Sequence, residues 1–327
     1  MDHVTGLPPA PAAFFTRGEA LARGETDRSL RSAVRSGQLV RLRHGAYALH
    51  EDVASYDERE HHLVVARAAL AQQKGAVALA GVSAALQRGF AVFGHDLGLV
   101  HLARLDGGSS RRQAGVVHHV LSDTAHRVEV VDGVLTVGAA DTVWQVALLS
   151  TLEGGVVTAD SALHQDPKIL DELRTVVGRS THQPRSRTAR LAIGLARKEA
   201  ESPGESLTRV ACFRHGVPAP DLQHVVVNEG GQLLGRTDFW WEDFEHLGEF
   251  DGQIKYGRLL KPGETSSLAV VKEKRREDRM RATGKGMSRF AWPEVLPGRA
   301  AARRMAELNH ELEQSRRLYV TVWSGRS

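Results

Sequence analysis

The hydrophobic and polar positions near the N-terminus follow two short helical periods separated by a tight turn. In the first, Thr16 stands at an N-cap position, Glu19 follows three residues later and Gly24 ends the segment, which is the signature of a capping box with a glycine stop. The second period runs from Glu25 to Gly37, with Asp27 as the expected cap. Its inward-facing apolar positions are Leu30 and Val34. The pattern predicts a helix, a tight turn and a second helix.

The next apolar positions alternate with polar ones, as they do in a half-buried strand. Residues 38–49 follow this alternation and break at His44 and Gly45, which predicts a small β-hairpin. Packed beside the two helices, such a hairpin is the wing of a winged helix-turn-helix. We therefore predict a DNA-binding domain of this type at residues 1–50.

The second predicted helix carries a row of arginines. Arg28, Arg31 and Arg35 fall on one helical face, where a recognition helix presents donors to phosphates and guanine edges. The predicted wing adds Arg41 and Arg43, followed by His44. The alternative is a solvated basic face on a small helical domain. DNA binding is the favoured interpretation because the caps, the basic face and the wing agree with one another.

The segment from Phe15 to Leu49 also looks like the N-terminal domain of AbiEi-family antitoxins, the DNA-binding members of type IV toxin–antitoxin pairs. This resemblance implies a regulator that controls its own operon through the promoter. It also implies a possible cognate toxin as a protein partner.

The middle of the chain, residues 51–178, alternates between helical and strand patterns. Small residues dominate the apolar segments 61–71 and 76–89, which favours closely packed helices. Short alternating runs between Val100 and Val137 are separated by Gly, Ser and Asp turns and predict a small antiparallel sheet. Helical periods return at residues 141–149 and 152–164. This order resembles the central part of actinobacterial AbiEi-like proteins, and it carries no assignable chemistry.

Histidines and arginines in this middle region are the candidates for a site. His118 and His119, with His101 and His126 nearby, lack a Cys or carboxylate at ligand spacing, and neighbours on a strand point to opposite faces. Surface or core histidines are therefore the better interpretation. The basic loop from Arg104 to Arg112 is either a contact with a phosphate backbone or a solvated turn.

A second candidate site lies in an alternating segment near the C-terminus. It reads as a strand ending in Asp238-Phe-Trp-Trp, an acidic turn at residues 242–245 and a second strand at residues 246–252, which together predict a hairpin. On paired strands, Asp238 and Glu249 face the same side. Two such carboxylates repel each other unless a metal ion or a proton lies between them.

This spacing resembles the PD-(D/E)XK nuclease core, in particular that of very-short-patch-repair-like endonucleases, where an Asp closes one strand and Glu-x-Asp-Gly closes the next. The matching residues are Asp238, Glu249, Asp251 and Gly252. In that fold a preceding helix often carries another Glu, for which Glu205 is the candidate. A basic helix from Lys272 and a buried strand from Ser288 follow, so that the resemblance covers residues 201–294.

The resemblance implies hydrolysis of a phosphodiester bond. Asp238 and Glu249 would bind Mg²⁺ or Mn²⁺, Glu205 would complete the shell or orient the attacking water, and Asp251 would add a ligand. Asp251 replaces the Lys that usually follows the Glu by two residues, and Lys255 is the shifted substitute that would stabilise developing charge. The arginines expected to hold the nucleic-acid backbone are Arg275, Arg276, Arg279 and Arg281. The alternative is an inactive nuclease-like fold kept for binding.

Composition narrows the class of protein only a little. The chain has 327 residues, 42% of them hydrophobic and 25% charged, which is ordinary for a soluble protein with two or three cores. A net charge of +4 allows a nucleic-acid partner without demanding one. The apolar runs are too short to cross a bilayer, so cytoplasmic residence is the expectation. The single Cys212 excludes an internal disulfide and is expected to be a small core residue.

The polar, turn-rich stretch from residue 178 to 188 marks the last domain boundary. We therefore predict an α+β multidomain chain with a winged helix at 1–50, a central mixed α/β domain at 51–178 and a PD-(D/E)XK nuclease-like α/β/α domain at 179–327. The leading functional hypothesis is an AbiEi antitoxin-like regulator that binds double-stranded DNA. The alternative is a Mg²⁺-dependent DNA endonuclease for defence or repair, targeted by its winged helix. The oligomeric state stays open.

Overall fold

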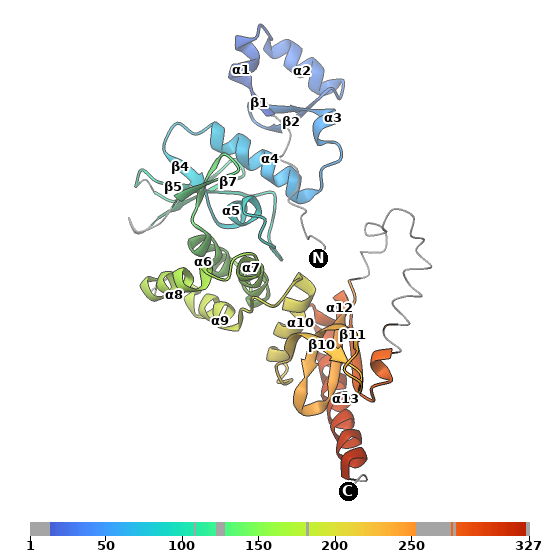
Figure 1. Cartoon of the computed structure of the whole chain (residues 1–327). Coiled ribbons are helices and arrows are strands. Elements are labelled where there is room, and N and C mark those ends of the chain that lie inside the picture. The colour runs from blue at the N-terminus through green and yellow to red at the C-terminus, as the bar shows by residue number, and fades with distance from the viewer. Residues whose placement is uncertain are drawn as a thin grey trace. The chain divides into compact units, whose positions relative to one another are not determined.

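The computed structural model describes residues 14–107, 109–121, 128–180, 183–252, 276 and 279–324 (Figure 1). The chain divides into two compact units, residues 1–194 and residues 195–327. Among the described residues, no helix combines the length and the apolar composition that a membrane crossing requires.

The N-terminal part of the first unit has the arrangement predicted for a winged helix-turn-helix. Its helices and strands are β1 (Phe14–Thr16), α1 (Arg17–Ala22), α2 (Asp27–Arg35), β2 (Leu39–Arg43) and β3 (Ala46–Leu49), followed by the short α3 (His50–Val53). The three strands form an antiparallel sheet in the order β1-β3-β2. Ala20, Leu30 and Leu39 form its core, and Phe15 and Val34 pack against them. The inward positions predicted for the second helix are confirmed.

The helix caps are confirmed for α1 and corrected for α2. Thr16 and Glu19 form the predicted reciprocal capping box. The cap of α2 is Thr26 and not Asp27, because the Thr26 backbone is extended and its hydroxyl accepts the Ser29 N–H at 3.1 Å. Asp27 is instead the first helical residue.

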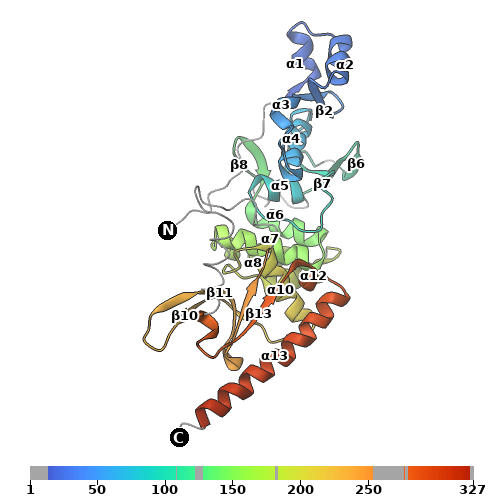
Figure 2. The same cartoon turned by 90° about the vertical axis from the view of Figure 1, so that its right-hand side faces the viewer.

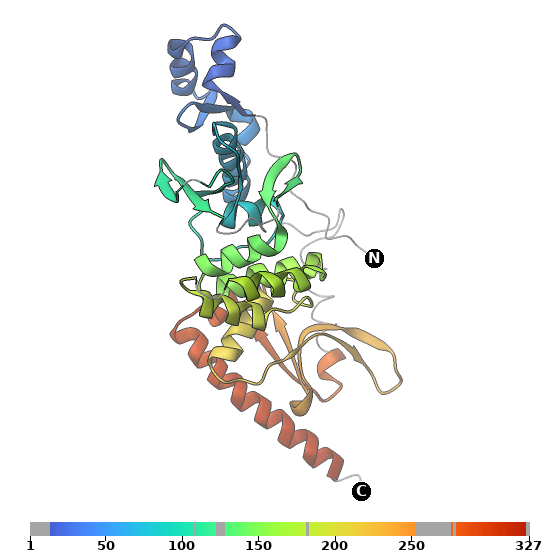
Figure 3. The ribbon, with the colours of Figure 1, turned by 90° about the vertical axis from the view of Figure 1, so that its left-hand side faces the viewer.

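The central part of the first unit is built on a six-stranded sheet in the order β6-β7-β5-β4-β9-β8. The strands are β4 (Val77–Leu79), β5 (Val100–Arg104), β6 (Arg111–Gln113), β7 (Val116–Val120), β8 (Val128–Val131) and β9 (Val134–Val137). The hairpins β6–β7 and β8–β9 lie at opposite edges (Figure 3). Helix α4 (Glu58–Ala71) packs Ala66 and Ala69 on one face.

The strand directions correct the predicted antiparallel sheet. Strand β5 runs parallel to β7, and β4 runs parallel to β9. Residues 77–79, expected to be helical, form β4 because they pair with both β5 and β9, and only α5 (Gly81–Gln87) is helical there. Long-range strand pairing therefore overrides the local preference of small residues for helix. The helical periods at 141–149 and 152–164 are confirmed. The last helices of this unit are α6 (Ala139–Leu149), α7 (Leu152–Gln165), α8 (Ile169–Arg179) and α9 (Ser186–Leu195).

The second unit places helices on both faces of a four-stranded sheet. Its elements are α10 (Pro203–Arg214), β10 (Asp221–Val227), β11 (Leu233–Trp241), the 3₁₀ turn η1 (Glu242–Phe244), β12 (His246–Phe250), β13 (Gly286–Phe290), α12 (Trp292–Val295) and α13 (Arg299–Ser324). The sheet order is β10-β11-β12-β13, with β13 parallel to β12 and the other pairs antiparallel. The predicted hairpin of β11 and β12 is confirmed.

Alternation along the strands separates the two faces of this sheet. On one face, the Arg304 guanidinium lies over the Phe290 ring. Arg304 belongs to α13, the long helix at the C-terminus (Figure 2). On the other, Trp240 and Leu247 cluster with Met280, which belongs to a helical segment at residues 279–281. The buried Cys212 of α10 contacts the Met305 sulfur at 3.8 Å, which confirms it as a core residue. Burial raises the pKa of the Cys212 thiol to about 12.

Gly204 lets α10 approach β12 closely. A Cβ at this position would lie 2.0 Å from the Phe250 ring. We expect Gly204→Ala to lower the free energy of unfolding by about 1–3 kcal/mol, because the ring must move in a packed layer. Urea unfolding followed by tryptophan fluorescence measures the change. Gly230→Ala is the matched control, since its Cβ would meet only the Asn228 side chain at 3.5 Å. Equal midpoints for the two variants would contradict the expectation.

Candidate nucleic-acid interface and carboxylate site

Helix α2 presents its arginines to solvent. Arg28, Arg31 and Arg35 are exposed, and none forms a hydrogen bond or salt bridge with another residue in the described part of the chain. The start of the helix is held by Arg17, whose guanidinium donates two 2.7 Å hydrogen bonds to the Asp27 carboxylate. The hydrogen bond from Arg17 lowers the pKa of Asp27. The arginine face is therefore exposed to solvent, and Asp27 at the start of α2 is paired with Arg17.

The two wing arginines differ in their surroundings. Arg41 is exposed, whereas Arg43 is half-buried, and burial lowers its pKa. The Nη1 atom of Arg43 is buried and has no hydrogen-bond partner among the described residues. The wing turn is tied to α4 because the carbonyl of His44 accepts a hydrogen bond from Gln72 at 2.9 Å. Arg41 is thus exposed to solvent, whereas the Nη1 atom of Arg43 is buried in the protein.

Asp238 and Glu249 lie on neighbouring antiparallel strands, as the pattern predicted. The register pairs Phe239 with Gly248, which places Asp238 and Glu249 one step further along the same ladder. The carboxylate of Asp238 accepts the Phe250 N–H at 2.8 Å. Burial, and to a lesser degree the charge of Glu205, raises the pKa of Asp238 to about 6, although the Phe250 hydrogen bond opposes the rise.

Glu249 is neutralised by arginines. The residue is only 8% exposed, and its carboxylate accepts hydrogen bonds from Arg276 at 2.5 Å and from Arg289 at 3.2 Å. Arg276 also donates to the carbonyl of Arg236 at 3.0 Å. Guanidinium groups thus lie where the sequence pattern suggested a metal ion or a proton. A cation at Glu249 must compete with Arg276.

Glu205 has a capping role at the start of α10. Ser202 donates to one of its carboxylate oxygens at 2.7 Å, and the Glu201 N–H and the Gln223 amide donate to the other at 3.0 and 2.8 Å. Burial raises its pKa. Glu205 is near enough to Asp238 to raise the pKa of that residue, but its own oxygens are already engaged in the cap.

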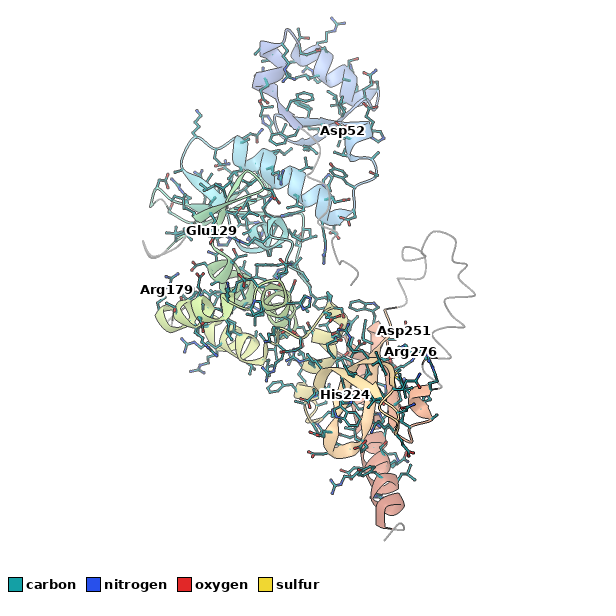
Figure 4. The ribbon with its side chains drawn as sticks, in the orientation of Figure 1. Asp52, Glu129, Arg179, His224, Asp251 and Arg276 are labelled. Carbon is teal, nitrogen blue, oxygen red and sulfur yellow. The ribbon has the colours of Figure 1, made fainter. Side chains whose placement is uncertain are left out.

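The remaining predicted residues lie around this carboxylate pair or outside the described residues. Asp251 is half-buried, and its backbone N–H donates to the Phe290 carbonyl at 2.8 Å. Figure 4 marks Asp251, directly after β12, and Arg276 on its helical segment. Arg279 and Arg281 are exposed. The predicted site residues Lys255 and Arg275 lie outside the described residues.

The side chains at this site supply only some of the ligands that a hard cation such as Mg²⁺ or Mn²⁺ requires. Carboxylate oxygens are the ligands that Mg²⁺ and Mn²⁺ prefer, and Asp238 and Glu249 supply them on one face of the sheet. No group of three or more His, Cys, Asp or Glu side chains within the described ranges is arranged to hold a metal ion. A bound ion would therefore rest on Asp238 and Glu249, with water or substrate oxygens completing its shell.

Two residues of this site are not apparent in the sequence pattern. Arg289 reaches Glu249 because the parallel pairing of β12 and β13 places them opposite each other. Gln223 lies in the ladder position facing Asp238, with a left-handed backbone at φ 58°. Its amide oxygen is buried without a partner among the described residues. Arg289 and Gln223 are recognised as site residues only from the pairing of distant strands, because no local sequence motif contains that information.

Of the central histidines, His101 and His118 are buried and His119 is half-buried, which agrees with the predicted surface or core residues. The His101 Nδ1 and His119 Nε2 atoms are 2.8 Å apart and their rings stack. On the other face of the sheet, His118 lies opposite Arg111 in the register of β7 and β6. Burial, followed by the charge of His119, lowers the pKa of His101 to about 3. His126 lies outside the described residues.

Comparisons with known proteins found similarity to proteins of Mycobacterium tuberculosis. It is 29% identical over 269 residues to the uncharacterized protein MT2308 of Mycobacterium tuberculosis strain CDC 1551 / Oshkosh, covering 77% of this chain and 93% of that protein. The same values hold for the uncharacterized protein Rv2248 of strain H37Rv. The crystal structure of the RV2827C protein from Mycobacterium tuberculosis shares 17% identity at a TM-score of 0.37, over 60% of this chain and 75% of that one.

A family model identifies the N-terminal domain. Residues 13–50 match the family described as "Transcriptional regulator, AbiEi antitoxin". The matched range coincides with the winged helix and includes the arginine face of α2 and the wing. The N-terminal segment of this chain therefore carries an AbiEi antitoxin domain, which supports a role in DNA-binding regulation.

Proposed function

We propose that the protein is a DNA-binding transcriptional regulator of the AbiEi antitoxin type that acts on the promoter of its own operon. The observation that carries this proposal is the exposed arginine face of α2, without salt-bridge partners among the described residues, inside the matched range. Such a face binds phosphates and guanine edges in the major groove. The wing residue Arg41 adds a backbone contact beside it.

Selection from random duplexes with the purified protein tests this proposal. The recovered sequence is expected to occur in the promoter upstream of the protein's own gene, and a duplex with that sequence should bind more tightly than a scrambled one. Recovery of no sequence preference would contradict regulation at a defined operator. Copurification with the product of an adjacent nucleotidyltransferase-type toxin gene would identify the partner that the antitoxin resemblance implies.

A second candidate function is Mg²⁺-dependent cleavage of DNA by the second unit. The observations that favour it are the paired Asp238 and Glu249 and the order of helix, three strands, helical segment and parallel fourth strand. This order is the one expected from the PD-(D/E)XK resemblance. A bound Mg²⁺ or Mn²⁺ would polarise the phosphate and lower the pKa of a bound water.

Residues of this chain would bind the ion, bind the DNA backbone and stabilise the developing charge. Asp238 and Glu249 would hold the ion, with Arg276 turned away from Glu249. Arg276 and the exposed Arg279 and Arg281 would then bind backbone phosphates next to the cleaved bond. Lys255 stays a predicted contributor to charge stabilisation.

Cleavage of supercoiled and linear DNA with Mg²⁺ or Mn²⁺ tests the second function. We expect Glu249→Ala to abolish any nicking, because it removes one of the two proposed ligands. Glu242→Ala, which removes an exposed carboxylate of η1, is the control and should cleave normally. Cleavage that survives Glu249→Ala would place the activity elsewhere or in a contaminant. Wild-type binding to DNA without cleavage would favour the regulator alone.

A further inference from the structure

Two buried nitrogen atoms, one at the wing and one on the central sheet, have no hydrogen-bond partner among the described residues. His118 of β7 is only 4% exposed, and its Nδ1 atom has no hydrogen-bond partner among the described residues. The Nη1 atom of Arg43, at the end of β2, is also buried and lacks a partner in the same set. Buried polar atoms are normally hydrogen-bonded, so each such atom requires an explanation.

The strand pairing gathers more cations around His118. Arg111 lies directly opposite His118 on β6, and Arg104 lies on the same face of the neighbouring strand β5. Helix α4 packs against both β2 and β5 and bonds the wing turn through Gln72, which brings Arg43 to this face.

The charges of these neighbours act on the pKa of His118. Burial lowers the pKa of His118, and the charges of Arg111, Arg104 and Arg43 lower it further, whereas Asp106 raises it. The Asp106 carboxylate is engaged by Arg104 in two hydrogen bonds of 2.9 and 2.7 Å. The positive charges of Arg111, Arg104 and Arg43 thus act on the buried imidazole of His118 against one carboxylate, Asp106, which Arg104 already engages.

We propose that Arg43, Arg111 and His118 form a binding site for a phosphate group. A tetrahedral oxyanion supplies several acceptors at once, which suits guanidinium donors, and its charge balances the cluster. Arg111 is exposed on the edge strand β6 and opens the site to solvent. The buried imidazole of His118 forms the part of the proposed phosphate site that is farthest from solvent.

The phosphate belongs either to a DNA backbone or to a small phosphorylated compound. In the first case the site rests on the proposed DNA-binding function and extends the footprint from the wing to the central sheet. In the second case it binds an effector next to the wing. The chemistry that recognises the group is the same in both cases.

The strand β6 offers a matched pair of variants for the test. Arg111 faces His118, whereas the next residue, Arg112, pairs with Val117 and acts on His101 of the opposite face. Both arginines are exposed, so that either alanine variant changes the charge equally without disturbing a core. Arg43→Gln removes the buried guanidinium but keeps a polar side chain.

Titration calorimetry with inorganic phosphate at constant ionic strength is the experiment. We expect the full-length protein and Arg112→Ala to bind phosphate, and Arg111→Ala and Arg43→Gln to bind at least about tenfold more weakly, the typical loss of one charge-assisted hydrogen bond. No binding by the wild type, or equal binding by all variants, would overturn the proposal.

A DNA-binding measurement over a range of salt concentrations distinguishes the two sources of phosphate. If the site holds a backbone phosphate, Arg111→Ala reduces the slope of log K against log salt by about 0.9 relative to Arg112→Ala. An unchanged slope with lost phosphate binding identifies a small phosphorylated ligand. Failure of the protein to bind any DNA would refute the proposed regulator but leave the calorimetric result intact.

Discussion

Replacing Arg28 and Arg31 together with alanine is expected to remove most of the DNA affinity of this protein. Both side chains are exposed on one face of α2 and have no salt bridge to another described residue, so they are available to a duplex. A specific arginine contact contributes about 1–3 kcal/mol, and two of them lost together weaken binding by at least about thirtyfold. Alanine is the best helix former, so α2 itself should persist.

Fluorescence anisotropy over a range of salt concentrations measures this loss. The slope of log K against log salt should fall by about 0.9 for each phosphate contact that is removed. The control variant, Arg174→Ala with Arg187→Ala, removes the same net charge from α8 and α9 of the same unit. Equal losses in the two double variants would mean that only total charge matters and that α2 is not the contacting helix.

Asp238→Asn is expected to stabilise the second unit at neutral pH. The folded protein holds the pKa of Asp238 at about 6, above the ordinary 3.8, mainly because the carboxylate is buried. Ionising it in the folded state costs up to about 3 kcal/mol, from roughly 1.4 kcal/mol for each unit of pKa. Asparagine mimics the protonated acid and keeps an oxygen for the Phe250 N–H.

The pH dependence follows from the direction of this shift. Between about pH 4 and pH 6 the folded state binds more protons at Asp238 than the unfolded state, so the free energy of unfolding falls as pH rises through this window. The Asn variant lacks this fall. Its advantage in melting temperature should be absent near pH 3.5 and complete above about pH 7. Equal stability of the two proteins at pH 7.5 would contradict the assignment.

The wild type and Asp238→Asn also test the proposed Mg²⁺ or Mn²⁺ site at Asp238 and Glu249, and no activity assay is needed. Added Mg²⁺ or Mn²⁺ should raise the melting temperature of the wild type and leave that of Asp238→Asn unchanged, because a ligand that binds only the folded state stabilises it. Equal shifts for both proteins would place the ion elsewhere. The gain in stability from Asp238→Asn would then reflect burial alone.

Local patterns in the amino-acid sequence predicted the N-terminal domain closely. The capping box of Thr16 and Glu19, the inward-facing Leu30 and Val34 and the hairpin that forms the wing depend on neighbours only a few residues away. The misplaced cap of α2 was an error of one residue, since Thr26 and Asp27 are both good caps and only the backbone conformation selects Thr26. The position of Asp238 beside Glu249 was likewise predicted, because period-two alternation around a short turn sets the register of a hairpin.

Contacts between distant segments could not be predicted in this way. The parallel pairs β5–β7 and β4–β9 make the central sheet mixed, and the parallel pairing of β13 with β12 brings Arg289 to Glu249. The salt bridge from Arg276 to Glu249 and the cluster of Arg43, Arg111 and His118 likewise join residues from different elements.

By itself, the sequence determined the capped helices, the arginine face of α2 and the acidic hairpin, because side-chain spacing and turn chemistry act over a few residues. Only the tertiary structure decided the raised pKa of Asp238, the pairing of Glu249 with Arg276 and the half-buried surroundings of Arg43. Burial and long-range pairing control both, since the pKa and the available partners of a side chain depend on which distant strands and helices surround it.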